Sequence, residues 1–247
     1  MYSTPKFLPA GDQALVVELG DEIDPEVNRR VRDLARAIDT RQVPGVVELV
    51  PTYRSLLVQY DAARTSPSEL QDALSELVGL GRGEPEKAHV VHIPTLYGGE
   101  HGPDLPNVAE RAGLTPDQVV ELHSTPEYLV YMMGFTPGFP YLGGLDQRLS
   151  IPRLSSPRQD ITAGSVGIAE GQTGIYPVTS PGGWRIIGRT PVRLFDPTRE
   201  PPSLLSAGDY VLFMPLDGEE DYHRVQAQVE TGEFHLNATI RSDSTRA

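Results

Sequence analysis

The sequence predicts an α+β protein with two domains, a small α/β domain of ferredoxin-like character and then a compact β-barrel. The first observation is the order strand–helix–strand–strand–helix in the N-terminal third. The second is a series of short apolar runs between Gly/Pro turns after Tyr128. The third is "GLGRGEPEKA" (79–88), whose composition is typical of a linker. We therefore predict domains at residues 1–83 and 89–240, joined by a linker at about 79–88.

Three apolar runs in the N-terminal domain predict strands. They are "ALVVEL" (14–19), "GVVELV" (45–50) and "SLLVQY" (55–60). No residue of these runs has a pattern typical of catalysis. The N-terminal domain is therefore expected to be a scaffold or an interface.

Two amphipathic segments between these runs predict helices. Asp24 followed by Pro25 predicts a helix start, because the carboxylate accepts hydrogen bonds from free N–H groups and proline suits the first helical position. The apolar residues that follow lie at helical spacing: Val27, Val31, Leu34, Ala35 and Ile38. Ser66-Pro67 predicts the second helix start, and its expected buried stripe is Leu70, Leu74, Leu77 and Val78.

The second domain is predicted to begin with helices and to continue with strands. The run "HVVHIP" (89–94) is a strand that either closes the first domain or opens the second. Two short helices are expected at "DLPNVAERAG" and "TPDQVVELHS". The expected strands after them are "YLVYMM", "GSVGIA", "GIYPV", "WRIIGR", "VRLFD" and "DYVLFMPL".

The net charge limits the classes of partner that the chain is expected to bind. The net charge is −13, which argues against nucleic acid or an anionic membrane as the main partner. Between Gly134 and Pro191, however, the sequence has five arginines and three carboxylates.

The N-terminus lacks the pattern of a signal peptide, and no apolar run reaches the ~20 residues of a membrane span. We expect a cytoplasmic protein.

Several chemistries are excluded by residue type. The chain has no cysteine, which removes thiolate nucleophiles and Cys-ligated zinc. Neither Lys6 nor Lys87 has the context of a nucleotide-binding P-loop, and no HExxH-type metal motif is present. "AGSVG" (163–167) resembles a nucleophile elbow, but strand residues follow where a helix is needed, so Ser165 is not expected to be a nucleophile. We predict no metal site on this chain.

The segment "GFTPGFPYLGG" mixes rigid proline, flexible glycine and flat aromatic side chains. We predict that Phe135, Phe139 and Tyr141 form the wall of a groove held by the prolines. The glycines would let a ligand or partner chain come close.

Polar side chains accompany this wall. A proline precedes Arg153 and Arg158, so each guanidinium either presents a planar fork to a carboxylate or phosphate, or makes a surface salt bridge. In "GQTGIYP" the hydrogen-bonding groups contact a ligand or satisfy their own turn; they are Gln172, Thr173 and Tyr176. Trp184, the only tryptophan, stacks on a flat ligand or fills the barrel. We add Arg189 of "IGRTP" to the candidate binding residues.

Seven blocks occur in the order seen in one family. They are "YGGEHGPDL", "VELHSTPEYLVYMMGFTPGFPYLGG", "PRLSSPR", "AGSVGIAEGQTGIYP", "SPGGW", "IGRTP" and "LFDPTR". Over essentially its whole length the chain resembles the family variously called the B subunit of 5-oxoprolinase, allophanate hydrolase subunit 1 and the inhibitor of a sporulation sensor kinase. The resemblance implies that the barrel is cyclophilin-like.

The resemblance also implies a function. The chain would be the B subunit of an ATP-dependent 5-oxoprolinase, inactive alone, that joins the C subunit to phosphorylate 5-oxoproline (pyroglutamate). The A subunit would then open the lactam to L-glutamate. ATP with Mg²⁺ is the expected co-substrate. His123, within "VELHSTPEY", is either a catalytic acid–base or a structural donor, and its place at a helix C-terminus favours the protonated form.

Two other functions remain open from the sequence. One is a non-catalytic inhibitor that binds a sensor histidine kinase through the aromatic groove. The other is a carboxyltransferase-like subunit of urea or allophanate metabolism, although nothing in the chain indicates biotin.

Overall fold

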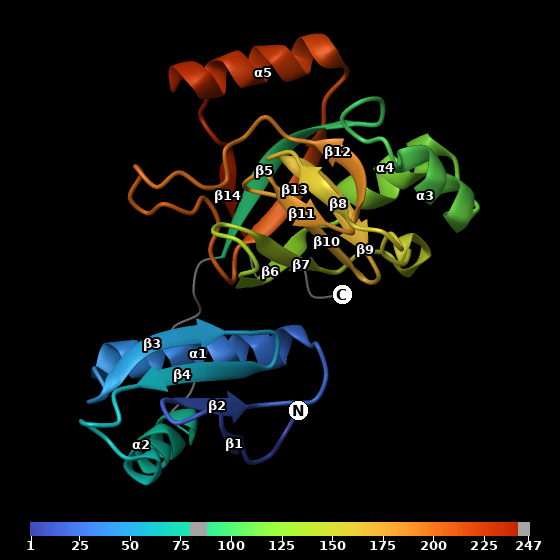
Figure 1. Ribbon diagram of the computed structural model, residues 1–247. Coiled ribbons are helices and arrows are strands. Elements are labelled where there is room, and N and C mark those ends of the chain that lie inside the picture. Colours follow the sequence, from blue (N-terminus) through green and yellow to red (C-terminus); the bar gives the residue numbers. More distant parts are fainter. Residues whose placement is uncertain (80–87, 242–247) are drawn as a thin grey trace. The chain divides into compact units, whose positions relative to one another are not determined.

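The computed structural model describes residues 1–79 and 88–241. The chain divides into two compact units, Met1–Glu86 and Lys87–Ala247 (Figure 1). The predicted linker at 79–88 lies almost wholly outside the described residues, and its bounds stay a prediction. No helix in the described ranges has both the length and the apolar character needed to cross a membrane.

Unit 1 is a four-stranded antiparallel sheet packed against two helices (Figure 1). The strand order is β1 (Lys6–Pro9), β2 (Ala14–Glu18), β4 (Ser55–Tyr60) and β3 (Val46–Pro51). The helices are α1 (Pro25–Arg41) and α2 (Pro67–Gly79). Alternate residues of β2 and β4 form a single core with the apolar stripes of both helices, as the sequence predicts. The ferredoxin-like prediction is confirmed, but its fourth strand is β1 at the N-terminus, and the run 89–94 belongs to unit 2.

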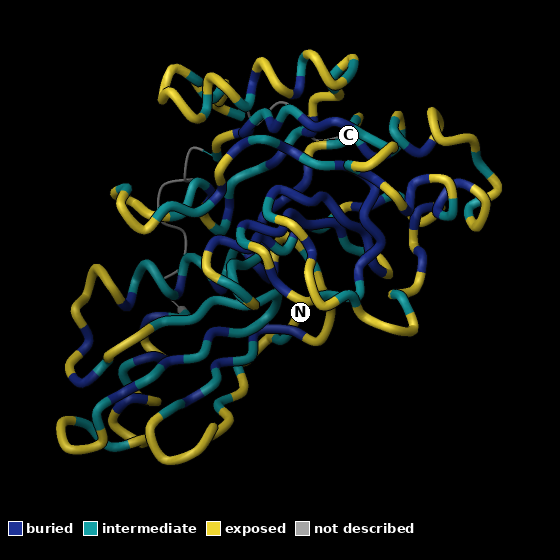
Figure 2. The backbone as a smooth tube through the Cα atoms, turned by 45° about the horizontal axis from the view of Figure 1, so that its top comes forward, coloured by how far each residue is buried: buried dark blue, intermediate teal, exposed yellow. Residues whose placement is uncertain are grey.

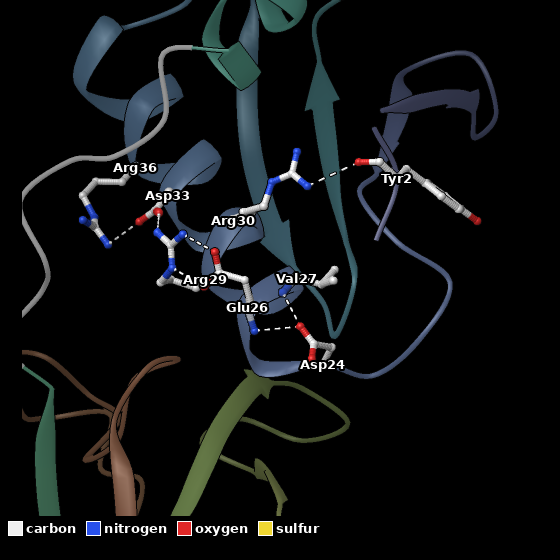
Figure 3. Close-up of polar contacts among 8 residues, drawn as sticks. All are labelled: Tyr2, Asp24, Glu26, Val27, Arg29, Arg30, Asp33 and Arg36. Atoms are coloured by element: carbon white, nitrogen blue, oxygen red, sulfur yellow. Dashed lines mark hydrogen bonds and ion pairs between the residues drawn. The ribbon is translucent and has the colours of Figure 1, made fainter. Parts of the chain in front are cut away.

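The start of α1 shows how the local sequence determines where a helix of this unit begins (Figure 3). Asp24 is the N-cap, and its Oδ1 accepts hydrogen bonds from the N–H groups of Glu26 at 2.9 Å and Val27 at 3.0 Å. On the helix surface, the Arg29 guanidinium bridges Glu26 of the preceding turn and Asp33 of the next. The two hydrogen bonds to Asp24 satisfy two of the free N–H donors that every helix start exposes.

Unit 2 is a closed barrel of seven described strands. In barrel order they are β12 (Arg185–Arg189), β9 (Ser165–Ala169), β10 (Gln172–Ile175), β7 (Pro140–Gly143), β6 (Tyr128–Met133), β13 (Tyr210–Pro215) and β5 (His89–Tyr97). The last strand, β5, pairs back to β12 and closes the barrel. Strand β14 (Ala238–Ile240) extends the sheet beside β5. A two-stranded ladder joins β8 (Arg158–Ile161) to β11 (Ser180–Gly182).

Three α-helices and a 3₁₀ turn cover the barrel (Figure 1). Helices α3 (Leu105–Ala112) and α4 (Pro116–Ser124) lie together at one side, and α5 (Glu219–Thr231) lies at another. The 3₁₀ turn η1 spans Gln147–Leu149. Figure 2 shows buried residues concentrated in the barrel strands, whereas α5 is largely exposed. The confirmed α+β class therefore has its larger core inside the barrel.

Some elements differ from the sequence prediction. Helix α5 was not expected, because it buries only Tyr222 and Val225 and so lacks a strong apolar stripe. The expected strand "VRLFD" is wrong: the segment makes only an isolated bridge from Phe195 to Ser203. Pro191 and Pro197 flank it and remove N–H donors that a ladder would need. Strand β10 begins earlier than predicted, at Gln172.

Removing the α1 cap is expected to destabilise unit 1. Asp24→Ala loses two hydrogen bonds to the first turn and should lower the free energy of unfolding by about 1 kcal/mol. Far-UV circular dichroism in a denaturant titration measures this. Asp21→Ala, whose exposed carboxylate lies 3.6 Å from the N-terminal amine, is the matched control and should change little. Equal midpoints for the two variants would contradict the capping role.

Candidate functional site

Two successive tight turns explain the unusual composition of "GFTPGF". The N–H of Thr136 donates to the carbonyl of Gly134 at 2.8 Å across Phe135, whose φ is 66°. This bond and this φ define a γ-turn of the rare, strained kind. The N–H of Phe139 then donates to the carbonyl of Thr136 at 3.0 Å, with Pro137 and a left-handed Gly138 (φ 81°) at the centre of a β-turn. The turns project the Phe135 side chain outward, 60% exposed.

Phe139 is the centre of an aromatic cluster. Its ring contacts four others in edge-to-face geometry, with centroid distances of 5.6 Å to Phe135, 5.1 Å to Tyr141, 5.3 Å to Tyr176 and 5.6 Å to Trp184. Phe139, Tyr176 and Trp184 are buried, which places Trp184 in the core. Only Phe135 and the half-buried Tyr141 offer ring surface. The predicted aromatic wall is therefore a two-residue surface supported by a three-residue core.

The hydroxyl of Tyr176 lies against a glycine turn. A Cβ on Gly182 would lie only 2.3 Å from this hydroxyl oxygen, so the close approach requires glycine. Burial raises the pKa of Tyr176 to about 12, against the opposing effect of Arg153 and Arg158 nearby. The hydroxyl is thus a neutral donor near two guanidinium groups.

Two buried hydroxyl oxygens near these turns make no hydrogen bond. They belong to Thr136, within the turn itself, and to Ser180, at the start of the β11 strand that ends at Gly182. Among the described residues these are the side-chain polar atoms that burial leaves without a partner. Such atoms are uncommon in native proteins and often mark functional positions.

The two predicted arginines have different environments. Arg158 makes a bidentate ion pair with Asp104, at 2.8 and 2.9 Å, and Asp104 also accepts the N–H of Ile186 at 2.7 Å. The Arg158 fork is therefore occupied by a carboxylate of the chain itself. The side chain of Arg153 is 57% exposed and lies 3.9 Å from Glu170, so its guanidinium is accessible. Asp104 was not identified from the sequence, where it reads only as the residue before a helix.

Gln172 and Arg189 lie at the ends of two barrel strands. Gln172 opens β10, half-buried, opposite Ala169 and Gly143. Arg189 ends β12 and donates to the carbonyl of Ala163 at 3.0 Å. Their roles in binding stay predictions.

His123 lies in a buried chain of hydrogen bonds. Its Nδ1 is 2.8 Å from the Tyr97 hydroxyl, and its Nε2 is 2.8 Å from Oγ1 of Thr173. That Oγ1 donates to the carbonyl of Gly167 at 3.1 Å, so it accepts from Nε2–H of the histidine. The Tyr97 hydroxyl then donates to Nδ1. Both ring nitrogens are used, and Thr173 faces the interior.

This environment reverses the expected charge of His123. Burial lowers its pKa to about 3, so the neutral ring is the stable form and the expectation of a protonated histidine is wrong. The effect of a helix C-terminus is at most ~2 kcal/mol and does not offset complete desolvation. A catalytic role stays a prediction, and the geometry favours the structural role.

A pocket of about 540 Å³ opens beside α4, on another part of unit 2. Its lining residues come from α4 and the residues that flank it, and from the segment 144–148, and none is a predicted site residue. Asp146, in its lining, is paired to Arg148 at 2.6 Å.

Comparisons with known proteins agree on one family. Residues 5–205 match the model of the carboxyltransferase domain, subdomain C and D. The chain is 45% identical to the B subunit of 5-oxoprolinase from Bacillus subtilis, over 86% of this chain and 93% of that protein.

Solved structures show the same fold. The crystal structure of TTHA0988 superposes with a TM-score of 0.75 at 41% identity, covering 84% of this chain. This chain spans only 40% of that longer protein. The urea amidolyase of K. lactis shares the fold at a TM-score of 0.78 and 22% identity, covering 95% of this chain and 16% of that one.

Breaking the Asp104–Arg158 pair is expected to destabilise unit 2. Asp104→Ala leaves a part-buried guanidinium and a buried N–H without an acceptor, and should cost about 2–3 kcal/mol of unfolding free energy. The fluorescence of Trp184, whose carbonyl lies 3.5 Å from Nη1 of Arg158, measures the transition. Asp146→Ala breaks the pair with the exposed Arg148 and should change the unfolding free energy little. A larger loss in the Asp146 variant would contradict this account.

His123 should make unit 2 sensitive to mild acid. A buried neutral histidine stabilises the fold fully above its unfolded pKa of ~6.5. That stability is lost as the pH falls from there towards the folded pKa of about 3. The slope is at most ~1.4 kcal/mol per pH unit. In His123→Gln, the unfolding free energy between pH 6 and pH 4 should vary less steeply, whereas the exposed His235→Gln should follow the unmodified protein. Parallel curves for all three would contradict the assignment.

Proposed function

The chain belongs to the family of the carboxyltransferase domain, subdomain C and D, and we propose that it acts as the B subunit of an ATP-dependent 5-oxoprolinase. It would join the C subunit to phosphorylate 5-oxoproline, and the A subunit would complete ring opening to L-glutamate. The isolated chain would be inactive. The absence of cysteine and the acidic charge agree with a cytoplasmic location.

The accessible guanidinium of Arg153, whose charge acts on Tyr176 of the aromatic cluster, is the observation that carries this proposal. The substrate 5-oxoproline is a small ring with one carboxylate. Arg153 would bind the carboxylate through its planar fork, and the rings of Phe135 and Tyr141 would flank the lactam. The neutral Tyr176 hydroxyl, near Arg153, would be a hydrogen-bonding group for its amide.

The proposed reaction moves the γ-phosphoryl group of ATP to the lactam carbonyl oxygen. The bond between the γ-phosphorus and the oxygen that bridges it to the β-phosphate breaks, and ADP leaves. Water then adds to the activated ring carbon, and the ring C–N bond breaks to free the amine. A second water releases inorganic phosphate from the resulting acyl phosphate and gives L-glutamate. Guanidinium groups in a site from which water is excluded would neutralise the developing charge on the oxygens. Mg²⁺ would arrive with the nucleotide, because it is usually held by one or two carboxylates together with substrate phosphates.

A partner chain is expected to complete this site. The sequence has no P-loop, and the solved relative TTHA0988 is a longer chain of which this one spans 40%. The exposed Phe135 in its strained turn also agrees with a surface that a partner or ligand covers.

The test is ADP release that depends on 5-oxoproline. It is measured on this chain alone and after co-expression with candidate C and A subunits. We expect turnover only in the assembled mixture. Arg153→Ala should lower kcat/KM about 100-fold or more, because a charge-assisted contact to the substrate carboxylate is lost. Arg224→Ala, an exposed arginine of α5, is the matched control. No turnover in a demonstrably formed complex would overturn the proposal.

A further inference from the structure

A pair of arginines, Arg111 and Arg185, shares one amide acceptor near the Pro152 backbone. Arg185, the first residue of β12, is only 7% exposed. Its Nε donates to the carbonyl of Pro152 at 3.0 Å, and its Nη1 donates to Oδ1 of Asn107 at 2.7 Å. No carboxylate of the described residues forms an ion pair with it.

Arg111 converges on the same acceptor from α3. Its Nε donates to Oδ1 of Asn107 at 3.1 Å, so one neutral amide oxygen serves two guanidinium groups. The pKa of Arg185 is lowered first by burial and then by the positive charge of Arg111. The two cations are therefore close enough to repel each other.

Asp104 partly offsets this repulsion at Arg185, and the positive charge of Arg158 adds to it. Asp104 is held by the fork of Arg158 and by the N–H of Ile186. The Asp104–Arg158 pair is neutral, so the charges of Arg111 and Arg185 remain, a local excess of two. Burying an uncompensated cation is costly unless an anion accompanies it. Both guanidinium groups keep terminal N–H donors for such an anion.

We propose that Arg111 and Arg185 form a binding site for a phosphoryl group. Phosphate carries a charge of about −1.5 to −2 at neutral pH, which matches two guanidinium groups better than a monocarboxylate does. Arginine also binds phosphate oxygens through paired N–H groups. Asn107 fixes the distance between the two cations. The site holds whether or not the chain belongs to a 5-oxoprolinase, because it depends only on these contacts.

The test uses the full chain without its partners. Its melting temperature is followed in titrations with inorganic phosphate and, separately, with ATP, at constant ionic strength set by chloride. We expect saturable stabilisation by at least one of the two. A response to inorganic phosphate identifies free phosphate as a sufficient ligand, and a response to ATP alone identifies a nucleotide phosphate.

Arg111→Gln tests the site itself, since Arg111 is exposed and its loss should leave the fold intact. We expect the Kd for the responding ligand to rise about tenfold, the loss of one charge-assisted contact. Arg224→Gln, another exposed helical arginine, should bind as the unmodified chain does. Arg185→Lys keeps the charge but not the fork and should also weaken binding.

Two results would overturn the proposal. One is the absence of saturable stabilisation by either ligand in the unmodified chain. The other is unchanged affinity in Arg111→Gln. Neither result bears on 5-oxoproline turnover, which is measured separately in the assembled complex.

Discussion

Strand β5 is the element on which the barrel depends, because it is hydrogen-bonded to three other strands. It runs parallel to β13 along residues 90–95, antiparallel to β14 at its start and antiparallel to β12 at its end. The last contact closes the ring at Gly188, where a Cβ would lie 2.8 Å from the Leu96 carbonyl oxygen. At the end of the strand, Tyr97 donates its hydroxyl to His123. The pairing that closes the barrel, the close packing at Gly188 and the buried His123 are therefore connected through strand β5.

The sequence predicted those elements that carry their own periodic pattern. The strands 55–60 and 128–133 follow from local runs of apolar residues, and the cap of α1 follows from Asp24-Pro25. Elements that owe their conformation to distant partners were missed or misplaced. Strand β1 is ordered by pairing with β2, and α5 has too few buried residues to show a helical stripe. Resemblance supplied the barrel type, which local patterns alone do not specify.

For the candidate site, the sequence singled out residue types but could not predict which of their side chains are exposed. Phe135 and Phe139 are four residues apart, yet one is 60% exposed and the other is 2% exposed. Arg153 and Arg158 both follow a proline, and only the three-dimensional position of Asp104 distinguishes them. The contact that decides each role comes from a residue 50 or more positions away along the chain, as with Asp104 for Arg158 and Thr173 for His123. Composition cannot reveal such pairs.

The γ-turn at Phe135 has a consequence for how this position evolves. A φ of 66° suits glycine, and a phenylalanine there costs backbone energy while exposing a large ring to water. Selection for stability alone would therefore replace it. Inside the chain the ring contacts Phe139, and the proposed ligand or partner contact would add a reason to keep an exposed ring at this backbone conformation. A redesign of this protein for stability alone would therefore replace Phe135, and with it the exposed ring of the proposed site.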